Sequence, residues 1–303
     1  MRRRVLVFVL LVAALIALRG GPRLLALRTP GALPDPAASP PIASAPLTVL
    51  TLNVLCSFCT KDGYDGWSER LPVLQAALAR HDPDLAALQE LARPAELDAL
   101  LGPRSPYTAL YHPLWPDSVL LYRTARFSVL DAGQLWLSPT PTLPLARAWR
   151  PGMPRLVQWA HLTDAQGGAL LFAATHLDGD RANKDASAAL IGQTIPPLAE
   201  RLPIILAGDL NTAISDDRMA ILSGGLQDAE QKAARSEQHG TVEGIPNTRR
   251  ELRPSLRIDH ILISEDIAVQ RFVHDAPIYG TPPRRPSDHP VIVAEVSVAP
   301  AAR

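Results

Sequence analysis

The sequence predicts one α/β (α+β) domain from Pro46 onward, with two β-sheets packed face to face and helices outside. Several strand-like runs follow one another with only turns between them, which argues against a regular alternation of strand and helix. Two helix-like runs also occur, with apolar residues at helical spacing. With 303 residues and 47% apolar content, the chain is long enough to bury the core of such a sandwich.

The strands and helices follow from local patterns. Two helices are predicted, at 68–83 and at 184–202, the second interrupted at Pro196-Pro197. Strands are predicted for the apolar, strand-like runs at 47–55, 84–90, 118–123, 155–162, 169–177, 203–211, 256–264 and 290–298.

The N-terminal segment differs from the rest of the chain. Three arginines precede an unbroken apolar run of fourteen residues from Val5 to Leu18. A spanning helix needs roughly 20 apolar residues and a signal-peptide core about 7–15, so residues 1–20 are predicted to be a signal peptide or an N-terminal membrane anchor. Residues 21–45 then form a Pro/Ala-rich linker and 46–303 the domain. We expect a periplasmic or secreted protein, or one anchored to the membrane by residues 5–18.

The charge balance bears on the partner. Residues 1–45 hold six arginines and one aspartate, so the remainder carries 24 basic and 29 acidic residues. Proteins that bind nucleic acid non-specifically usually carry a basic face. The acidic excess lowers the expectation of a duplex-DNA partner without excluding a local basic patch.

The two cysteines, Cys56 and Cys59, form the motif "CSFC". One C-x-x-C pair cannot supply a four-thiolate zinc site. In an exported protein a small local disulfide is the simplest fate. A redox-active pair is the alternative, but such pairs usually stand at a helix N-terminus, and this one follows a strand-like stretch.

Polar residues recur in or beside the predicted strands. Each alone fits a cap, a turn or a surface position. Together they do not, because placing such groups in apolar strands costs several kcal/mol unless they converge and satisfy one another or a cation. The residues are Asn53, Glu90, His176, Asp178, Asp209, Asn211, Asp259, Asp288 and His289.

The ordered series "TLNV", "LQE", "THLD", "GDLN", "RIDHIL" and "SDHPV" resembles the endonuclease/exonuclease/phosphatase superfamily, over about residues 48–297. The resemblance implies a four-layered α/β sandwich of two mixed, mainly antiparallel sheets. It also implies Mg²⁺-dependent hydrolysis of phosphoesters. Hard cations prefer carboxylate and amide oxygens, which this series supplies.

Residue roles follow from the chemistry and the resemblance. Glu90, Asn53 and Asp288 are the candidate ligands of Mg²⁺, with Mn²⁺ or Ca²⁺ as alternatives. By similarity, Asp209 and Asn211 would position the attacking water and a phosphate oxygen, and Asp209 is an alternative base and a candidate ligand of a second metal.

The histidines divide into site and structural groups. His289 is the predicted general base, with Asp259 accepting its other N–H. His176 would hydrogen-bond a phosphate oxygen or protonate the leaving oxygen, with Asp178 steadying it from the same strand face. His260 is predicted to be structural. The arginines between 249 and 257 are interpreted as a solvated charge run rather than a phosphate clamp.

The predicted function is a metal-dependent phosphoesterase acting on phosphodiesters, with nucleic acid as the default substrate. A sphingomyelinase-like enzyme, or another lipid or small-molecule phosphodiesterase or phosphatase, is the alternative. A tethered non-catalytic binding module and a thiol redox protein are the rivals from other classes. We expect a monomer, with the N-terminal segment as its possible contact with the membrane.

Overall fold

The computed structural model describes residues 42, 46–59, 61–239 and 257–298. The predicted signal or anchor and nearly all of the linker therefore lie outside the described residues, as do Arg249, Arg250 and Arg253. In the part that is described, no helix is long and apolar enough to cross a membrane.

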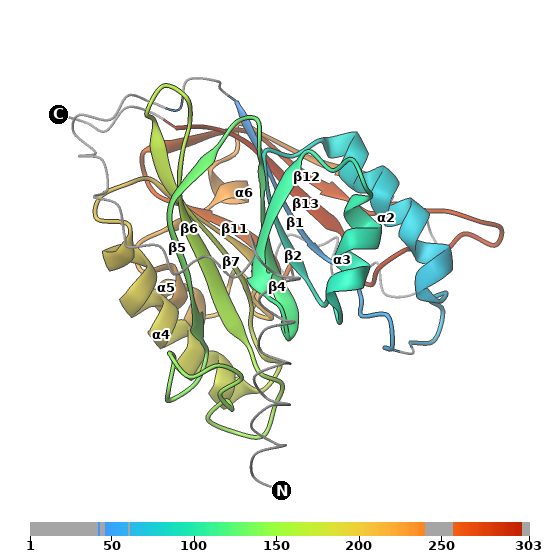
Figure 1. Ribbon diagram of the computed structural model, residues 1–303, viewed down its shortest axis with the longest axis horizontal. Helices are drawn as coiled ribbons and strands as arrows, with labels where there is room; N and C mark the ends of the chain where they lie inside the picture. Colours follow the sequence, from blue (N-terminus) through green and yellow to red (C-terminus); the bar gives the residue numbers. More distant parts are fainter. Residues whose placement is uncertain (1–41, 43–45, 60, 240–256, 299–303) are drawn as a thin grey trace, which may run out of the picture.

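Two β-sheets form the centre of the molecule (Figure 1). The seven-stranded sheet has the order β10-β12-β13-β1-β2-β4-β3 and the six-stranded sheet the order β5-β6-β7-β8-β11-β9. The strands of the first are β1 Leu47–Asn53, β2 Leu85–Gln89, β3 Tyr107–His112, β4 Trp115–Arg123, β10 Arg235–His239, β12 Ile267–Asp275 and β13 Val291–Val298. Those of the second are β5 Ser128–Trp136, β6 Leu156–Thr163, β7 Ala169–His176, β8 Ile204–Asp209, β9 Gln227–Asp228 and β11 Asp259–Ile263.

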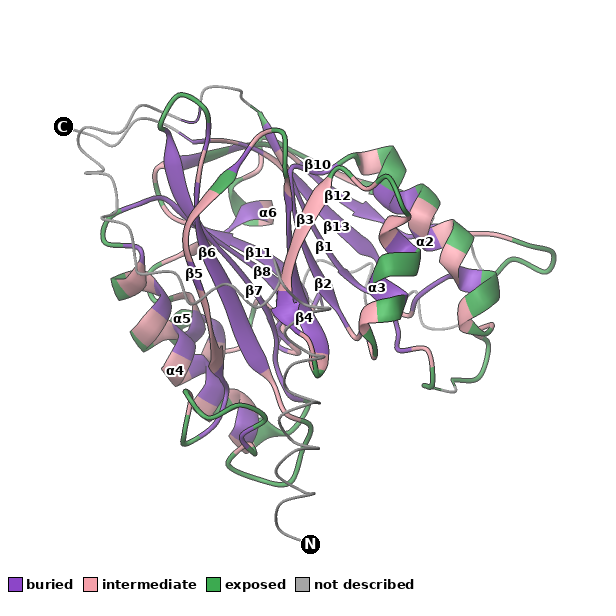
Figure 2. Cartoon of the chain, viewed as in Figure 1, coloured by how far each residue is buried: buried purple, intermediate pink, exposed green. Residues whose placement is uncertain are grey.

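Helices cover the outer face of each sheet, which gives four layers. The helices α2 Trp67–His81 and α3 Pro94–Leu101 pack on the seven-stranded sheet. The helices α4 Arg181–Leu198 and α5 Arg218–Ser223 pack on the six-stranded one, and the one-turn α6 Ala229–Lys232 follows β9. Figure 2 shows the central strands buried, the edge strands β3 and β5 only partly so, and the helices exposed along one side, as amphipathic helices on a sheet should be. Most strand pairs are antiparallel; β1–β2, β7–β8 and β10–β12 are parallel. The predicted fold class is confirmed.

Some elements differ from their prediction. The strands β3, β5, β9, β10 and β12 and the short helices α3, α5 and α6 were not predicted. The exposed and buried residues of β12 nevertheless alternate at its start as in a half-buried strand. The helix α4 begins earlier than predicted, because the Asp180 side chain accepts a hydrogen bond from the Asn183 backbone N–H and caps it. Pro196 and Pro197 lie in the last turn of α4 and do not interrupt it.

Candidate active site

The site lies at one end of the core between the two sheets. Side chains alternate along each strand, and on β8 the core-facing position of Ala207 is followed on the same face by Asp209. Three other strands also continue their core face into a buried polar residue at one end: Asn53 on β1, His176 on β7 and Asp259 on β11.

Strand register brings these ends together. Asp209 pairs with His176 across the parallel β7–β8 ladder and with Asp259 across the antiparallel β8–β11 ladder. In the other sheet, Asn53 pairs with Gln89, so Glu90 follows directly at the same edge. Glu90 has a φ of 65° and Asn211 a φ of 46°. Such left-handed conformations cost of order 1 kcal/mol and often mark functional turns.

Asn53 joins the carboxylates of the two sheets. Its Nδ2 donates to Glu90 Oε1 at 2.9 Å and to Asp209 Oδ2 at 3.1 Å. Its Oδ1 accepts from the Leu55 backbone N–H at 3.0 Å. The side chain therefore presents N–H groups rather than its oxygen to the two carboxylates. The other oxygen of Glu90 accepts from the Cys56 backbone N–H at 3.0 Å.

His289 and Asp259 form the predicted pair. His289 Nδ1 lies 2.7 Å from Asp259 Oδ2, and its Nε2 lies 3.7 Å from Asp209 Oδ2. The Ser287 hydroxyl fixes the loop before β13, since it donates to the Asn53 carbonyl at 2.6 Å and accepts from the His289 backbone N–H at 3.1 Å. The Nε2 atom is thus directed toward the carboxylate cluster, where a general base would have to act.

His176 is held by residues that the sequence did not point to. Its Nε2 lies 3.3 Å from Asp209 Oδ2, while its Nδ1 lies 3.3 Å from Asp117 and 2.6 Å from Arg155 Nη1. Arg155 also donates to Asp117 at 2.5 Å. Asp117 lies within β4 and Arg155 directly precedes β6. Their only sequence signal is a charge beside an apolar strand run, which is also typical of a turn.

Asp178 does not steady His176 as predicted. The strand β7 ends at His176, so the two-residue alternation behind that prediction no longer applies at Asp178. Its carboxylate instead accepts from the Asp180 backbone N–H at 2.8 Å and from Asn183 Nδ2 at 3.3 Å.

Asn211 lies beside His176 and Asp209, and its role toward water and phosphate stays a prediction. Its backbone N–H donates to Asp209 Oδ1 at 2.9 Å, and its Nδ2 donates to the Leu177 carbonyl at 2.9 Å and lies 3.5 Å from His176 Nε2. Lys184 Nζ donates to the Asn211 carbonyl at 2.7 Å.

Asp288 faces a lysine. Its carboxylate forms an ion pair with Lys61. Among the described residues, no hydrogen bond or ion pair joins Asp288 to Glu90 or Asn53. Its assignment as a metal ligand stays a prediction.

Arg70 braces this side of the site. Its buried guanidinium donates to the Val54 carbonyl at 2.7 Å, the Leu55 carbonyl at 2.8 Å and the Pro286 carbonyl at 2.7 Å. The end of β1 and the loop that carries Ser287 are thereby tied together. A lone arginine in a helical run gave no sequence signal for this.

The charges shift the pKa values of the site groups. Burial and Arg155 lower the pKa of His176, but Asp117 and Asp209 outweigh them and raise it to about 9. Burial also opposes the charge on His289, yet Asp259 and Asp209 raise its pKa well above the usual value. Burial alone would raise the pKa of Asp209; His289 and His176 overcome it and lower that pKa. Burial raises the pKa of Asp259. The two carboxylates thus favour the protonated imidazole of His176.

The residues fit a hard divalent cation. Glu90 and Asp209 are joined through one amide, and Asp259 Oδ1 is buried without a hydrogen-bond partner among the described groups. Asp209, Asp259 and His289 also place potential ligand atoms within 4.8 Å of one another. Oxygen donors at this density are those that Mg²⁺ or Ca²⁺ select. Glu90 and Asp209 are the residues best placed to hold the ion.

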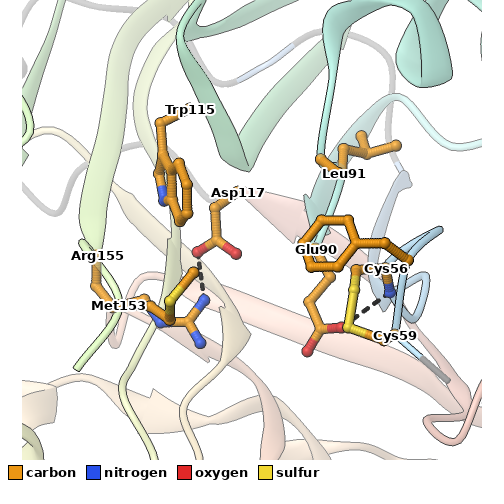
Figure 3. A pocket seen from close by; sticks show the side chains of 10 residues that line it. Cys56, Cys59, Glu90, Leu91, Trp115, Asp117, Met153 and Arg155 are labelled. Atoms are coloured by element: carbon orange, nitrogen blue, oxygen red, sulfur yellow. Dashed lines mark hydrogen bonds and ion pairs between the residues drawn. A yellow bond between two sulfur atoms is a disulfide. The ribbon is translucent and has the colours of Figure 1, made fainter. Parts of the chain in front are cut away.

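A pocket of about 150 Å³ opens beside Glu90 (Figure 3). Trp115, Asp117, Met153 and Arg155 line one side of it, and the Cys56–Cys59 disulfide stands on the other side beside Glu90. The structure therefore pairs the two cysteines locally, as expected. Since both thiols are used, the cysteines do not form a metal site with Glu90.

His260 lies outside the site, although it neighbours Asp259. On the opposite face of β11, its Nδ1 lies 2.8 Å from Asp228 Oδ2 and its Nε2 lies 2.8 Å from the Thr212 carbonyl. Arg257 donates to Asp228 at 2.7 Å and to Glu230 at 3.1 Å, and it is buried. The solvated interpretation was therefore wrong for Arg257.

A two-sheet sandwich with carboxylates, amides and histidines at one edge of its core defines an α/β phosphoesterase. The model of the Endonuclease/Exonuclease/phosphatase family matches residues 50–289, and the chain belongs to this family, whose members hydrolyse phosphoesters.

Solved structures agree. An endonuclease/exonuclease/phosphatase family protein from Bacteroides thetaiotaomicron is 26% identical, with a TM-score of 0.73 over 85% of this chain and 98% of that one. A mannosyl-6-phosphatase from Bacteroides thetaiotaomicron VPI-5482 is 28% identical, with a TM-score of 0.69 over 82% and 99%. The human Nocturnin catalytic domain with bound sulfate shares the fold at 18% identity, with a TM-score of 0.63 over 88% and 99%. No curated protein matches the sequence.

Proposed function

We propose that the protein is an exported, Mg²⁺-dependent hydrolase of small or lipid phosphoesters. One observation carries the proposal: strands of both sheets end in a single cluster of Glu90, Asn53, Asp209, Asp259, His176 and His289. Such a cluster is costly to bury unless a cation and an anionic substrate use it.

The cation supplies charge neutralisation of the phosphate oxygens and a water of lowered pKa. Glu90 and Asp209 would hold it. His289 would accept the proton of the attacking water through Nε2, with Asp259 holding its Nδ1, and Asp209 is the alternative base. The base must be uncharged, and a cation held by Asp209 would lower the pKa of His289 and favour its neutral imidazole. His176 and Asn211 would donate to a phosphate oxygen or to the leaving oxygen.

The pocket supports a small or lipid substrate over the nucleic acid that was the default from sequence. Its walls carry the apolar side chains of Phe58, Trp115 and Met153, and its cation, Arg155, is already paired with Asp117. A nucleic-acid strand would need a row of free cations along its backbone. The similar mannosyl-6-phosphatase supports adding sugar phosphates to the candidate substrates.

Export is supported by the apolar segment at 5–18 and by the disulfide, because disulfides persist mainly in oxidising compartments. Whether the segment is cleaved or retained decides between a released and an anchored enzyme.

The test is hydrolysis with and without Mg²⁺, using a sugar phosphate, an inositol phosphate, sphingomyelin and plasmid DNA. We expect turnover of at least one of the first three, loss on chelation and recovery with added Mg²⁺. Glu90→Ala and His289→Ala should each lower the rate by roughly 10²–10⁴-fold. His239→Ala, which removes an exposed histidine from the edge strand β10, is the matched control and should keep the rate.

Full activity in both site variants would refute the proposal. A folded, metal-binding protein with no turnover of any substrate would favour the binding-module alternative. Preference for DNA would restore nucleic acid as the substrate.

A further inference from the structure

Exposed apolar side chains gather around the mouth of the site. Seven large hydrophobic residues are exposed in the described part of the chain, and six of them lie on three loops. Phe58 is on the loop after β1, Leu114 is in the β3–β4 turn, and the other four are Leu143, Leu145, Trp149 and Met153 in the β5–β6 connection. We call these three loops the rim. The seventh residue, Ile221, lies on α5 over the outer face of the six-stranded sheet.

The three loops of the rim meet at the pocket. Phe58, Trp115 and Met153 line the same pocket, so the three loops meet there (Figure 3). Trp115 Nε1 donates to the Pro154 carbonyl at 2.8 Å, which ties the β3–β4 turn to the β5–β6 connection. All three loops lie at the lower edge of the sheets in Figure 1.

The β5–β6 connection is anchored, so its apolar side chains are held outward. Asn183 on α4 is buried, accepts from the Arg150 backbone N–H at 2.8 Å and donates to the Arg150 carbonyl at 3.3 Å. A Cβ at Gly152 would lie 2.2 Å from Asp178 Oδ2, which shows how closely this loop packs on the start of α4.

The β5–β6 connection, which carries four of the six exposed apolar residues of the rim, has charge of one sign, whereas the loop after β1 holds Lys61, Asp62 and Asp65. Residues 137–155 contain Arg147, Arg150 and Arg155 and no aspartate or glutamate, although the domain as a whole is acidic. Arg155 is used inside the site, whereas Arg147 and Arg150 are exposed and have no ion pair with any described residue. Arginines interspersed with tryptophan and leucine at a surface are typical of segments that enter the headgroup layer of a bilayer.

We propose that the rim docks on an anionic phospholipid bilayer, so that the mouth of the site faces the membrane. The apolar side chains enter the interface, and Arg147 and Arg150 pair with lipid phosphates. Docking does not require turnover, so it can be tested separately from hydrolysis. If the proposed function also holds, the substrate is a phosphoester that is presented at the membrane surface.

The first test is hydrogen–deuterium exchange of the full chain with vesicles. Phosphatidylglycerol mixed into phosphatidylcholine should slow exchange of residues 113–115 and 137–155, and pure phosphatidylcholine should slow it much less. The readout is local to the rim, so it does not depend on whether residues 5–18 also bind the vesicle. The α5 helix serves as the internal control and should not change.

The second test uses matched variants. Leu143→Ser with Trp149→Ser should abolish the slowed exchange and lower vesicle partitioning by roughly tenfold or more where the N-terminal segment does not dominate binding. Ile221→Ser removes an equally exposed apolar side chain outside the rim and should change neither. Glu90→Ala should still dock.

Unchanged exchange at the rim would overturn the proposal, as would equal protection by neutral vesicles. Protection by duplex DNA but not by anionic vesicles would assign the rim to nucleic acid and would also overturn it. Loss of docking in Ile221→Ser to the same extent as in the rim variant would show that the effect is not specific to the rim.

Discussion

The strand β11 carries two buried aspartate–histidine pairs on its opposite faces. Asp259 meets His289 at 2.7 Å on the core face, and His260 meets Asp228 at 2.8 Å on the other. The residue types and distances match, but the surroundings do not. Asp228 also accepts from Arg257, and both nitrogens of His260 have partners. Asp259 Oδ1 has no hydrogen-bond partner among the groups that the structure describes, and His289 faces a second carboxylate.

The difference separates chemistry from structure. In the Asp228 pair the carboxylate and both histidine nitrogens have partners within the fold, so the pair is costly to break and offers no free group to a ligand. In the Asp259 pair the negative charge is in excess and one histidine nitrogen faces outward from the pair. An aspartate–histidine contact is therefore not evidence of catalysis by itself. The evidence is the excess of negative charge around the Asp259 pair.

The largest expected effect is on activity, in Asp259→Asn. The amide cannot stabilise an imidazolium on His289, so the rate should fall roughly 10²–10⁴-fold. The buried carboxylate of Asp259 already has a raised pKa, so a neutral amide should change the free energy of unfolding by only about 1 kcal/mol. Steady-state rates and urea unfolding check both parts. A rate within tenfold of wild type would mean that the pair does not act in catalysis.

Asp228→Asn should give the opposite result. It removes one of the two carboxylates that accept from buried Arg257 and also the partner of His260 Nδ1, while Glu230 still accepts from Arg257, so the loss should be about 2–3 kcal/mol. The free energy of unfolding from urea titration should fall by that amount, while the rate per folded molecule stays within a few-fold. A stable variant with a lost rate would put Asp228 in the site and remove the distinction.

Many residues of the site could be predicted from the amino-acid sequence alone. Asn53, Glu90, Asp209 and Asp259 stand in or directly after apolar strand runs, where a polar residue is costly enough to be conspicuous. The strand alternation that gives a sandwich its core also sets which face each one occupies. The number of layers came from the family resemblance, because a series of strand-like runs does not show how many layers the strands and helices form.

Other features depend on contacts between distant segments. Asp117 and Arg155 reach His176 only because β4 of one sheet packs against β6 and β7 of the other. Arg257 is buried only because Asp228 lies on the neighbouring β9. The local sequence does not show which distant segments will pack against a residue. A charged residue that becomes buried therefore has the same local pattern as one that stays exposed to solvent.

A substitution at Gly208 tests whether the Asp228 and Asp259 pairs depend on the same β8–β11 ladder. In this ladder Gly208 lies opposite His260, and the next residue, Asp209, lies opposite Asp259. A Cβ there would stand 1.9 Å from the Thr175 carbonyl oxygen, a backbone atom that cannot rotate away. Gly208→Ala should therefore cost about 3 kcal/mol of stability and also lower the rate. Gly179→Ala has open space around its Cβ and should be neutral. Loss of only one of the two properties would show that the pairs are supported separately.

The smallest expected effect is the acid response of the structural pair. Burial would raise the pKa of Asp228, but His260 and Arg257 outweigh it and lower the pKa to about 2. A depressed carboxylate pKa adds stability above the unfolded value of 3.8 that is lost as the pH falls through the folded value, because the unfolded chain then binds the extra proton. The full contribution is on the order of 2 kcal/mol, of which about 1 kcal/mol should disappear between about pH 5 and pH 3.

Other carboxylates titrate in the same range, so the informative quantity is the difference between wild type and Asp228→Asn. Urea unfolding at both pH values should show the variant losing about 1 kcal/mol less on acidification. An equal loss in the two proteins would mean that Arg257 and His260 do not hold Asp228 ionised. The charge compensation that distinguishes this pair from the Asp259 pair would then be missing.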